Sequence, residues 1–197
     1  MIAVMSKEGS KFTGVAIDLA DENALLRASL AETRDRLEEL EQSADFDVLT
    51  DLPNRRRFER ELARVVGQAE RHGTPAALLS IDLRGLGGIN ERHGRLAGDA
   101  ALIHVARLLA GLIRSTDLLA RVGDGQFGLI LDHLDQNSAI ETAERLTRCI
   151  AAEPLDVGGR EVSIEAAIAT TGILAGDSFD DVLVRAERNL ARTKTES

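Results

Sequence analysis

With 197 residues and a formal net charge of −9, the chain has room for one domain of ordinary size plus an appendage, and its acidity argues against a general phosphate-backbone binder. Only 3% of the residues are aromatic, with no Trp and no Tyr, which argues against binding of single-stranded nucleic acid by base stacking. One cysteine cannot form an internal disulfide, and no apolar run approaches the ~18 residues of a membrane span, so a cytoplasmic protein is expected.

The first 45 residues divide into a tail and a helix with a heptad pattern. Residues 1–18 have scattered apolar positions without a sustained period, and we expect a tail or a short docking strand there. Beyond them, two series of positions recur every seven residues with an offset of four, as in a two-stranded coiled coil. Residues 19–45 are therefore predicted to form a homodimerisation helix, with a single amphipathic helix folded onto its own domain as the alternative. The two series are Leu19, Leu26, Thr33 and Leu40, and Asn23, Leu30, Leu37 and Ala44.

Residues 46–197 alternate between helical and strand patterns. A tight hairpin is predicted at the Asp124-Gly125 step, because this dipeptide separates two short apolar runs. A glycine-rich loop is expected over residues 84–98. The order of elements predicts an α+β, ferredoxin-like fold, in which helices flank a mainly antiparallel central sheet. Helices are predicted at 55–72, 99–114, 137–152 and 179–193, and strands at 75–83, 118–122, 127–131 and 161–170.

Several short segments between about Asp47 and Lys194 match one family in a fixed order. They read DVLTDLPNRRRF, LLSIDLRGLGGIN, HGRLAGD, LLARVGDGQF, AERL and AERNLARTK. Together they resemble the bacterial GGDEF domain, the module that joins two GTP molecules into cyclic di-GMP. The resemblance implies the palm-like sheet of nucleotide cyclases, in agreement with the predicted order of elements.

The chain departs from the family pattern where the resemblance places the catalytic metal. In the signature turn, residues 121–127, the acidic third position is Gly125. Asp82 is kept on the metal-binding strand, but the second acid of that strand is Arg84 and the phosphate-binding Lys falls at Gly87. A site that lacks one carboxylate and gains a cation is unfavourable for Mg²⁺, so metal binding at Asp82 is doubtful.

Asp124 is the remaining acid of the signature turn. Because a shift of one residue along a strand turns a side chain to the other face, we expect Asp124 to point away from Asp82 and to serve as a turn former. The alternative is an active diguanylate cyclase with a non-standard signature, in which Asp82 and Asp124 hold the metal.

The resemblance also assigns residues to a nucleotide pocket. It implies that Asn90 and Asp99 contact guanine and that Lys194 contacts phosphate, so GTP binding is expected as an option, with Mg²⁺ needed only if that site is occupied. The structural alternatives are a loop-closing role for Asn90 and a helix N-cap role for Asp99.

A second ligand site is predicted at RSTD, which runs from Arg114 to Asp117. It begins nine residues before Gly123, which is the spacing of the family's inhibitory product site, RxxD, and Arg145 matches the arginine that completes that site. An arginine fork can bond O6 and N7 of guanine, while a carboxylate accepts from its N1 and N2 donors. The alternative for Arg114 and Asp117 is a surface ion pair worth ~0–1 kcal/mol.

These observations predict a catalytically degenerate GGDEF protein. It is expected to bind cyclic di-GMP at Arg114, Asp117 and Arg145, to act as a dimer and to signal to a protein partner, without a required cofactor. The alternatives are the active cyclase, and a GTP-binding or ligand-independent interaction scaffold.

Overall fold

The computed structural model describes residues 23, 24, 26, 27, 29, 30, 32, 33 and 45–196. The chain divides into two units, residues 1–44 and 45–197. The expected tail at 1–18 and most of the expected helix at 19–45 lie outside the described residues. The described positions between 23 and 33 are helical, and Leu26 and Leu30 are 63% and 51% exposed. The dimeric coiled coil therefore stays a prediction.

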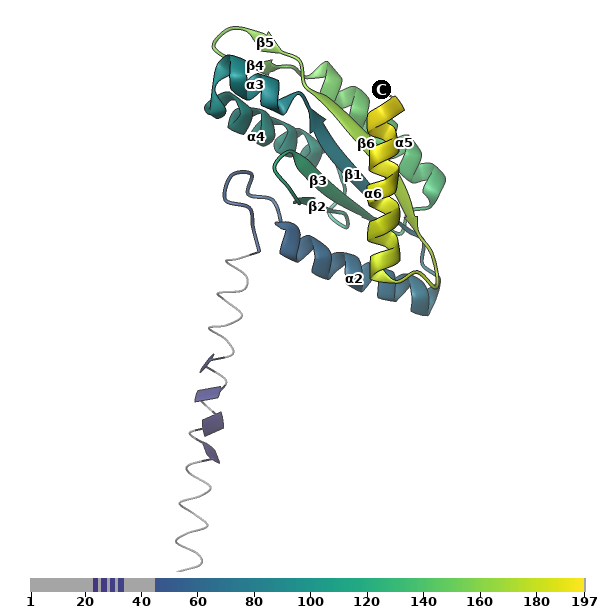
Figure 1. Ribbon diagram of the computed structural model, residues 1–197. Coiled ribbons are helices and arrows are strands. Elements are labelled where there is room, and N and C mark those ends of the chain that lie inside the picture. The colour runs from purple at the N-terminus through teal and green to yellow at the C-terminus, as the bar shows by residue number, and fades with distance from the viewer. Residues whose placement is uncertain (1–22, 25, 28, 31, 34–44, 197) are drawn as a thin grey trace, which may run out of the picture. The chain divides into compact units, whose positions relative to one another are not determined.

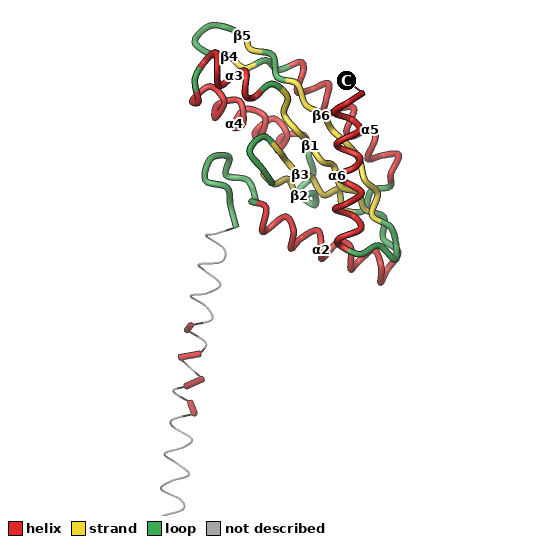
Figure 2. Tube along the Cα trace, in the orientation of Figure 1, coloured by secondary structure: helices red, strands yellow, loops and turns green. Residues whose placement is uncertain are grey.

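A four-stranded antiparallel sheet forms the centre of the unit 45–197 (Figures 1 and 2). The strand order is β2-β3-β1-β6, and β1 pairs with both β3 and β6. The four strands are β1 (Ala76–Arg84), β2 (Leu118–Arg121), β3 (Gln126–Asp132) and β6 (Glu165–Ile173). A small separate hairpin, β4 (Leu155–Asp156) and β5 (Glu161–Val162), precedes β6, so the strand expected at 161–170 is split in two.

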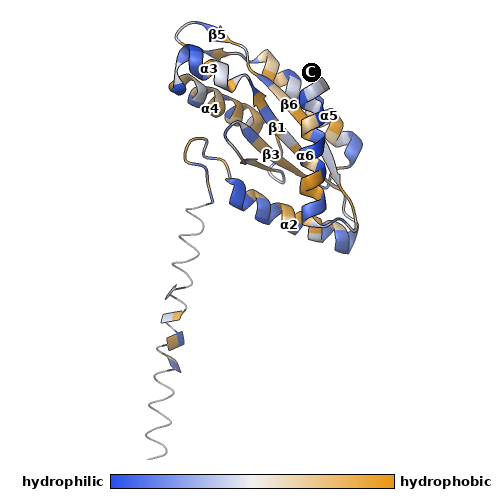
Figure 3. Cartoon of the chain, in the orientation of Figure 1, coloured by the Kyte–Doolittle hydropathy of each residue, from blue (hydrophilic) through white to orange (hydrophobic). Residues whose placement is uncertain are grey.

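Helices cover both faces of the sheet, because alternate residues of its strands are apolar on both sides. Leu78 of β1 belongs to the core beneath α2 (Arg55–His72) and α6 (Phe179–Glu196). Its neighbour Leu79 belongs to the core beneath α4 (Arg95–Leu112) and α5 (Gln136–Ala152). Figure 3 shows the resulting hydrophobic strands between helices of mixed hydropathy. The α+β fold with a helix-flanked antiparallel sheet is therefore confirmed.

Helix α2 begins and ends where the sequence predicts. The Asn54 side chain caps the first turn by accepting from the Arg57 amide, and Gly73 ends the helix in the left-handed region, with φ of 63°. The buried residues of α2 are Phe58, Leu62, Val65, Val66 and Ala69.

The segment 84–98 was wrongly predicted as a loop. It contains helix α3 (Leu86–His93), and α4 begins at Arg95 instead of Asp99. Because α3 buries only Ile89 and contains two glycines, its sequence carries no apolar period that would indicate a helix. Asp99 consequently lies inside α4, and the alternative that made it an N-cap is wrong. None of the helices within the described residues is long and apolar enough to cross a bilayer.

Candidate functional site

The carboxyl end of β1 brings Asp82 next to the signature turn. In the antiparallel register Asp82 lies opposite Gln126 of β3, so the two side chains share one face of the sheet. Gln126 Nε2 donates to Asp82 Oδ1 at 3.1 Å, and Lys194 Nζ of α6 lies 2.8 Å from the same oxygen. Two donors of the chain itself therefore engage the carboxylate that the resemblance assigned to a metal.

Arg84 lies two residues further along β1 and is tied to the end of α6. Its Nη2 donates to the carbonyl oxygen of Thr193 at 3.0 Å. A cation at a helix C-terminus is favourable, because the last carbonyl groups carry partial negative charge. The residue that replaces the family's second acid thus has a structural contact of its own, beside Lys194.

Arg121 holds the tip of the hairpin. Its Nε and Nη2 donate to the carbonyl oxygens of Gly123 and Asp124, at 3.2 and 3.0 Å. Its Nη1 pairs with Asp47 Oδ1 at 3.0 Å, which anchors the turn to the segment that precedes α2. Burial raises the pKa of Asp47, but hydrogen bonds from Thr50 and Arg121 outweigh it and hold this pKa below its ordinary value.

A cavity of about 420 Å³ lies between the signature turn and the start of α3. Asp124 is exposed at its edge, and within the described residues its carboxylate has no hydrogen bond or ion pair. An added Cβ at Gly125 would lie 3.3 Å from Leu86 Cδ2, so a side chain there requires a small shift of Leu86. The cavity is lined by Asp82, Leu83, Gly85, Leu86, Gly87, Asp124, Gly125 and Gln126.

The residues at this cavity do not fit Mg²⁺. This ion requires near-octahedral oxygen coordination, usually with one or two carboxylates. The Asp82 carboxylate is shared by Lys194 and Gln126, and Gly125 stands where the resemblance places the third-position acid. No group of three His, Cys, Asp or Glu side chains that could hold a metal occurs in the part of the chain that the structure describes.

The two residues expected to contact guanine lie on neighbouring helices. Asn90 belongs to α3, and its amide packs so closely on Gly98 of α4 that a Cβ at Gly98 would collide with it. Asp99 is the next residue of α4 and is half-buried. Neither side chain makes a hydrogen bond within the described residues. Lys194, the third expected contact, is paired with Asp82.

The RxxD pocket is a small cavity of about 50 Å³ that brings Arg114, Asp117 and Arg145 together. Asp117 Oδ2 accepts from the backbone amide of Arg114 at 3.0 Å, and Arg145 Nη2 donates to the carbonyl oxygen of Leu112 at 3.2 Å. Among the described residues, the Arg114 guanidinium has no hydrogen bond or ion pair, so the surface ion pair of the alternative does not form. Both guanidinium groups are exposed and lack an acidic partner in the described chain.

The sequence did not predict the side-chain contacts that Asp82 and Arg121 make in the fold. The Asp82–Gln126 contact follows from the register of β1 and β3, which a sequence without a known strand order does not reveal. The Asp47–Arg121 pair joins positions far apart in the chain. Its only sequence signal was the DVLT segment, whose Asp47 precedes a turn.

The family model for the diguanylate cyclase GGDEF domain matches residues 44–197. The probable diguanylate cyclase DgcE of Escherichia coli is 35% identical over 128 residues, which cover 65% of this chain and 12% of DgcE. The bifunctional diguanylate cyclase/cyclic di-GMP phosphodiesterase MucR of Pseudomonas aeruginosa is 34% identical over 145 residues, which cover 74% of this chain and 21% of MucR. The chain thus spans a minor part of the length of these curated relatives.

A solved structure gives the same result. The coiled coil and GGDEF domain of DgcB from Caulobacter crescentus, in complex with c-di-GMP, is similar with a TM-score of 0.77 and 25% identity, covering 93% of this chain and 95% of that chain. Since the family model covers most of the chain and the fold agrees, this chain belongs to the GGDEF family of diguanylate cyclase domains.

Proposed function

We propose that this chain is a catalytically degenerate GGDEF protein that binds cyclic di-GMP and passes the signal to a protein partner. One observation carries the proposal. Arg114, Asp117 and Arg145 converge on one pocket, and neither guanidinium is neutralised by an acid among the described residues. In a protein of net charge −9, such a pair of cations is a local attraction for an anionic ligand.

The chemistry of the RxxD pocket suits the edge of a guanine base and a phosphate. The Arg114 fork can donate to O6 and N7 of guanine. Asp117 uses only Oδ2 for the Arg114 amide, so Oδ1 remains able to accept from the N1 and N2 donors of the base. Arg145 supplies a second cation for a phosphate. Because the pocket measures about 50 Å³, we expect it to receive a base edge, with most of the dinucleotide on the surface.

The structure of DgcB supports the choice of ligand, since that relative is in complex with c-di-GMP. Cyclic di-GMP carries two guanines and two phosphates, so bound copies can bridge the sites of two neighbouring domains. We therefore propose a homodimer that acts in the cytoplasm and associates through residues 19–45. Ligand concentration would then control the arrangement of its two domains.

Catalysis is not part of the proposal, because the donors around Asp82 do not fit a metal. No cofactor is required for the receptor role. GTP is a second candidate ligand, favoured by the Asn90 amide and the Asp99 carboxylate, which have no partner within the described residues. For GTP to reach Lys194, this side chain would have to release Asp82, and Mg²⁺ would enter only with the nucleotide.

Calorimetric titration of cyclic di-GMP into the full chain tests the receptor role. We expect saturable heat with the unmodified protein, loss of that heat with Arg114→Ala, and no change with Arg107→Ala, which removes an exposed arginine of the preceding helix, α4. Absence of heat with the unmodified protein would overturn the proposal, and equal heat with Arg114→Ala would remove the RxxD pocket from it.

A further inference from the structure

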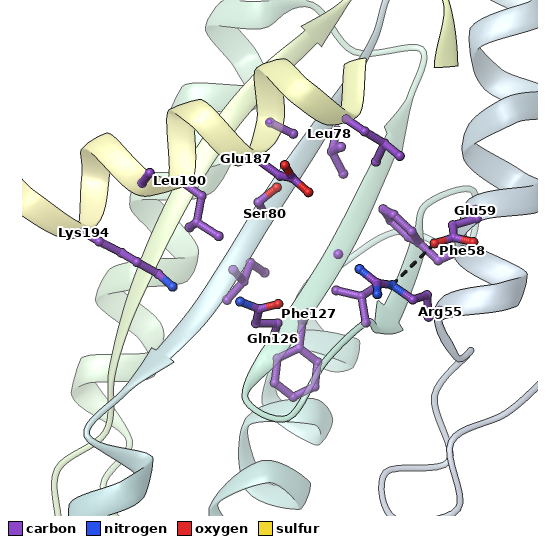
Figure 4. Close-up of a pocket in the computed structure, with 16 residues that line it drawn as sticks. Arg55, Phe58, Glu59, Leu78, Ser80, Gln126, Phe127, Glu187, Leu190 and Lys194 are labelled. Atoms are coloured by element: carbon purple, nitrogen blue, oxygen red, sulfur yellow. Dashed lines mark ion pairs between the residues drawn. The ribbon is translucent and has the colours of Figure 1, made fainter. Parts of the chain in front are cut away.

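A second pocket, the α2–α6 cavity, lies on the face of the sheet opposite the RxxD pocket. Figure 4 shows the α2–α6 cavity in close-up. Its volume is about 320 Å³, which lies within the usual range of small-molecule sites. Strands β1 and β3 form its floor, and helices α2 and α6 form its walls. The residues that carry the argument are Phe58, Ser80, Gly128, Glu187, Leu190 and Lys194.

Small side chains keep this cavity open. Ser80 and Ala186 line it where larger residues would fill the space between the helices, and Gly128 makes room for the ring of Phe58. A Cβ at Gly128 would lie 2.5 Å from Phe58 Cε2, so the Phe58 ring packs directly on β3. The cavity therefore has an aromatic wall from α2 and an aliphatic wall from α6, where Leu190 lines it.

Charged side chains surround the opening of the cavity, and most of them already form ion pairs. Arg55 Nε lies 3.4 Å from Glu59 Oε1, and Lys194 pairs with Asp82. Glu187 differs, since its carboxylate makes no hydrogen bond or ion pair with any described residue. Figure 4 shows this side chain directed from α6 toward the strand that carries Ser80.

Ser80 adds a polar group to the floor. Within the described residues its hydroxyl has no hydrogen-bond partner, although the residue is half-buried on β1. The exposed, unpaired carboxylate of Glu187 favours a donor that carries positive charge. The half-buried hydroxyl of Ser80 can donate or accept, so it can accept a hydrogen bond from the same donor. An anion would meet Glu187 without finding an unmatched cation, since Arg55 and Lys194 are engaged.

We propose that the α2–α6 cavity binds a small organic ammonium ion with an apolar body about the size of one aromatic ring. The ammonium group donates to Glu187 and to the Ser80 hydroxyl, and the ring packs between Phe58 and Leu190. This site shares no residue with the RxxD pocket, so it does not depend on the proposed function.

The test uses 2-phenylethylamine as the probe and amide chemical shifts of the full chain as the readout. We expect saturable shifts at Ser80, Gly128 and Ala186, with weaker binding of the anion phenylacetate and of the neutral 2-phenylethanol. Ser80→Val, which fills the floor with a residue that suits a strand, should abolish binding. Failure of the amine to produce saturable shifts at these residues would overturn the proposal.

Charge variants test the role of Glu187. Glu187→Gln should weaken binding of 2-phenylethylamine about fivefold, as expected for one exposed ion pair. Glu141→Gln makes the same charge change on α5, which packs on the other face, and should leave binding unaltered. Equal binding of phenylacetate, or an unchanged affinity with Glu187→Gln, would contradict the charge assignment. Cyclic di-GMP titrations of the same variants separate a failure here from a failure at the RxxD pocket.

Discussion

At the signature turn the carboxylate of Asp82 is matched by Lys194 and Gln126, whereas at the RxxD pocket the Arg114 guanidinium faces no acid among the described residues. Both places hold residues to which the resemblance assigns ligands. At the signature turn, the polar side chains pair with one another and connect α6 to the sheet. At the RxxD pocket, hydrogen-bond donors and an acceptor remain available for a ligand. The identity of a residue is thus a weaker guide to binding than the partners it has found in the fold.

The two places are joined by one hairpin. Asp117 immediately precedes β2, and Gln126 is the first residue of β3. Substitutions at the two ends of this hairpin should therefore separate two effects. Changes at the RxxD pocket should alter affinity for cyclic di-GMP with little effect on stability, and changes around Asp82 should do the reverse.

The largest effect is expected for Arg145→Ala at the RxxD pocket. Loss of a charged donor to the ligand should lower the affinity for cyclic di-GMP by about ten- to a hundredfold, as for other charge-assisted contacts. The free energy of unfolding should change by less than about 0.5 kcal/mol, because the side chain is exposed. Arg148→Ala is the matched control on α5, since Arg148 only approaches Glu144 at 4.0 Å and both are exposed. A similar loss of affinity with both variants would show that Arg145 at the RxxD pocket matters no more for binding than another exposed arginine of α5.

A scaffold carboxylate outside both sites should show the next largest effect. Asp45 has a side chain only 6% exposed and pairs with Arg56 and Arg60. Hydrogen bonding from Arg60 holds the pKa of Asp45 below its ordinary value, despite burial. Asp45→Asn should lower the free energy of unfolding by about 2 kcal/mol at pH 7, and the affinity for cyclic di-GMP should not change.

The pH dependence of that variant follows from the sign of the shift. Because the folded pKa of Asp45 is depressed, its contribution is fully present above the unfolded value near 3.8 and is lost as the pH falls through the folded pKa. Denaturant unfolding of both proteins should therefore give free energies that converge below pH 3.8. A difference that stays constant down to pH 3 would show that Asp45 acts through packing instead of charge.

At the signature turn, Lys194→Met should have a smaller effect. The ion pair with Asp82 is partly exposed, with 39% of the Lys194 side chain and 19% of the Asp82 side chain accessible. Its removal should cost about 0.5–1 kcal/mol of unfolding free energy, measured by denaturant titration. Arg192→Met removes an exposed cation of the same helix and should cost less. Loss of cyclic di-GMP binding with Lys194→Met would contradict the separation of the two regions.

The smallest effect is expected for Gly125→Glu. This variant restores the third-position acid, but Arg84, Gln126 and Lys194 remain around Asp82. We expect no detectable formation of cyclic di-GMP from GTP and Mg²⁺, with Gly125→Ala as the control for the added side chain beside Leu86. Formation of cyclic di-GMP by Gly125→Glu would show that the missing carboxylate at this position was the sole reason for the lack of cyclase activity.

The parts of the fold that could be predicted from sequence have local causes. Asn54 and Gly73 mark the ends of α2, and the Asp124-Gly125 step marks the hairpin between β2 and β3. Helix α3 could not be predicted, because it has one buried residue and two glycines. Its position depends on packing against α4, where Gly98 accommodates Asn90.

The candidate sites likewise include one whose residues could be predicted from the sequence and others whose contacts could not. The grouping of Arg114, Asp117 and Arg145 followed from motif spacing and family resemblance, and the structure places them in one pocket. The pairing of Asp82 with Lys194 could not be foreseen, because it joins the first strand to the last helix through the sheet order. The α2–α6 cavity likewise depends on how two helices pack over small residues, which no local pattern reports.

The most direct test of the account is the formation of cyclic di-GMP by the purified chain incubated with GTP and either Mg²⁺ or Mn²⁺. The same assay with Arg114→Ala removes retention of product at the RxxD pocket, so weak turnover would not be hidden. We expect no product above a protein-free control for either protein. Accumulation of cyclic di-GMP with either one would contradict it, because the groups around Asp82 would then support the metal chemistry that their geometry opposes.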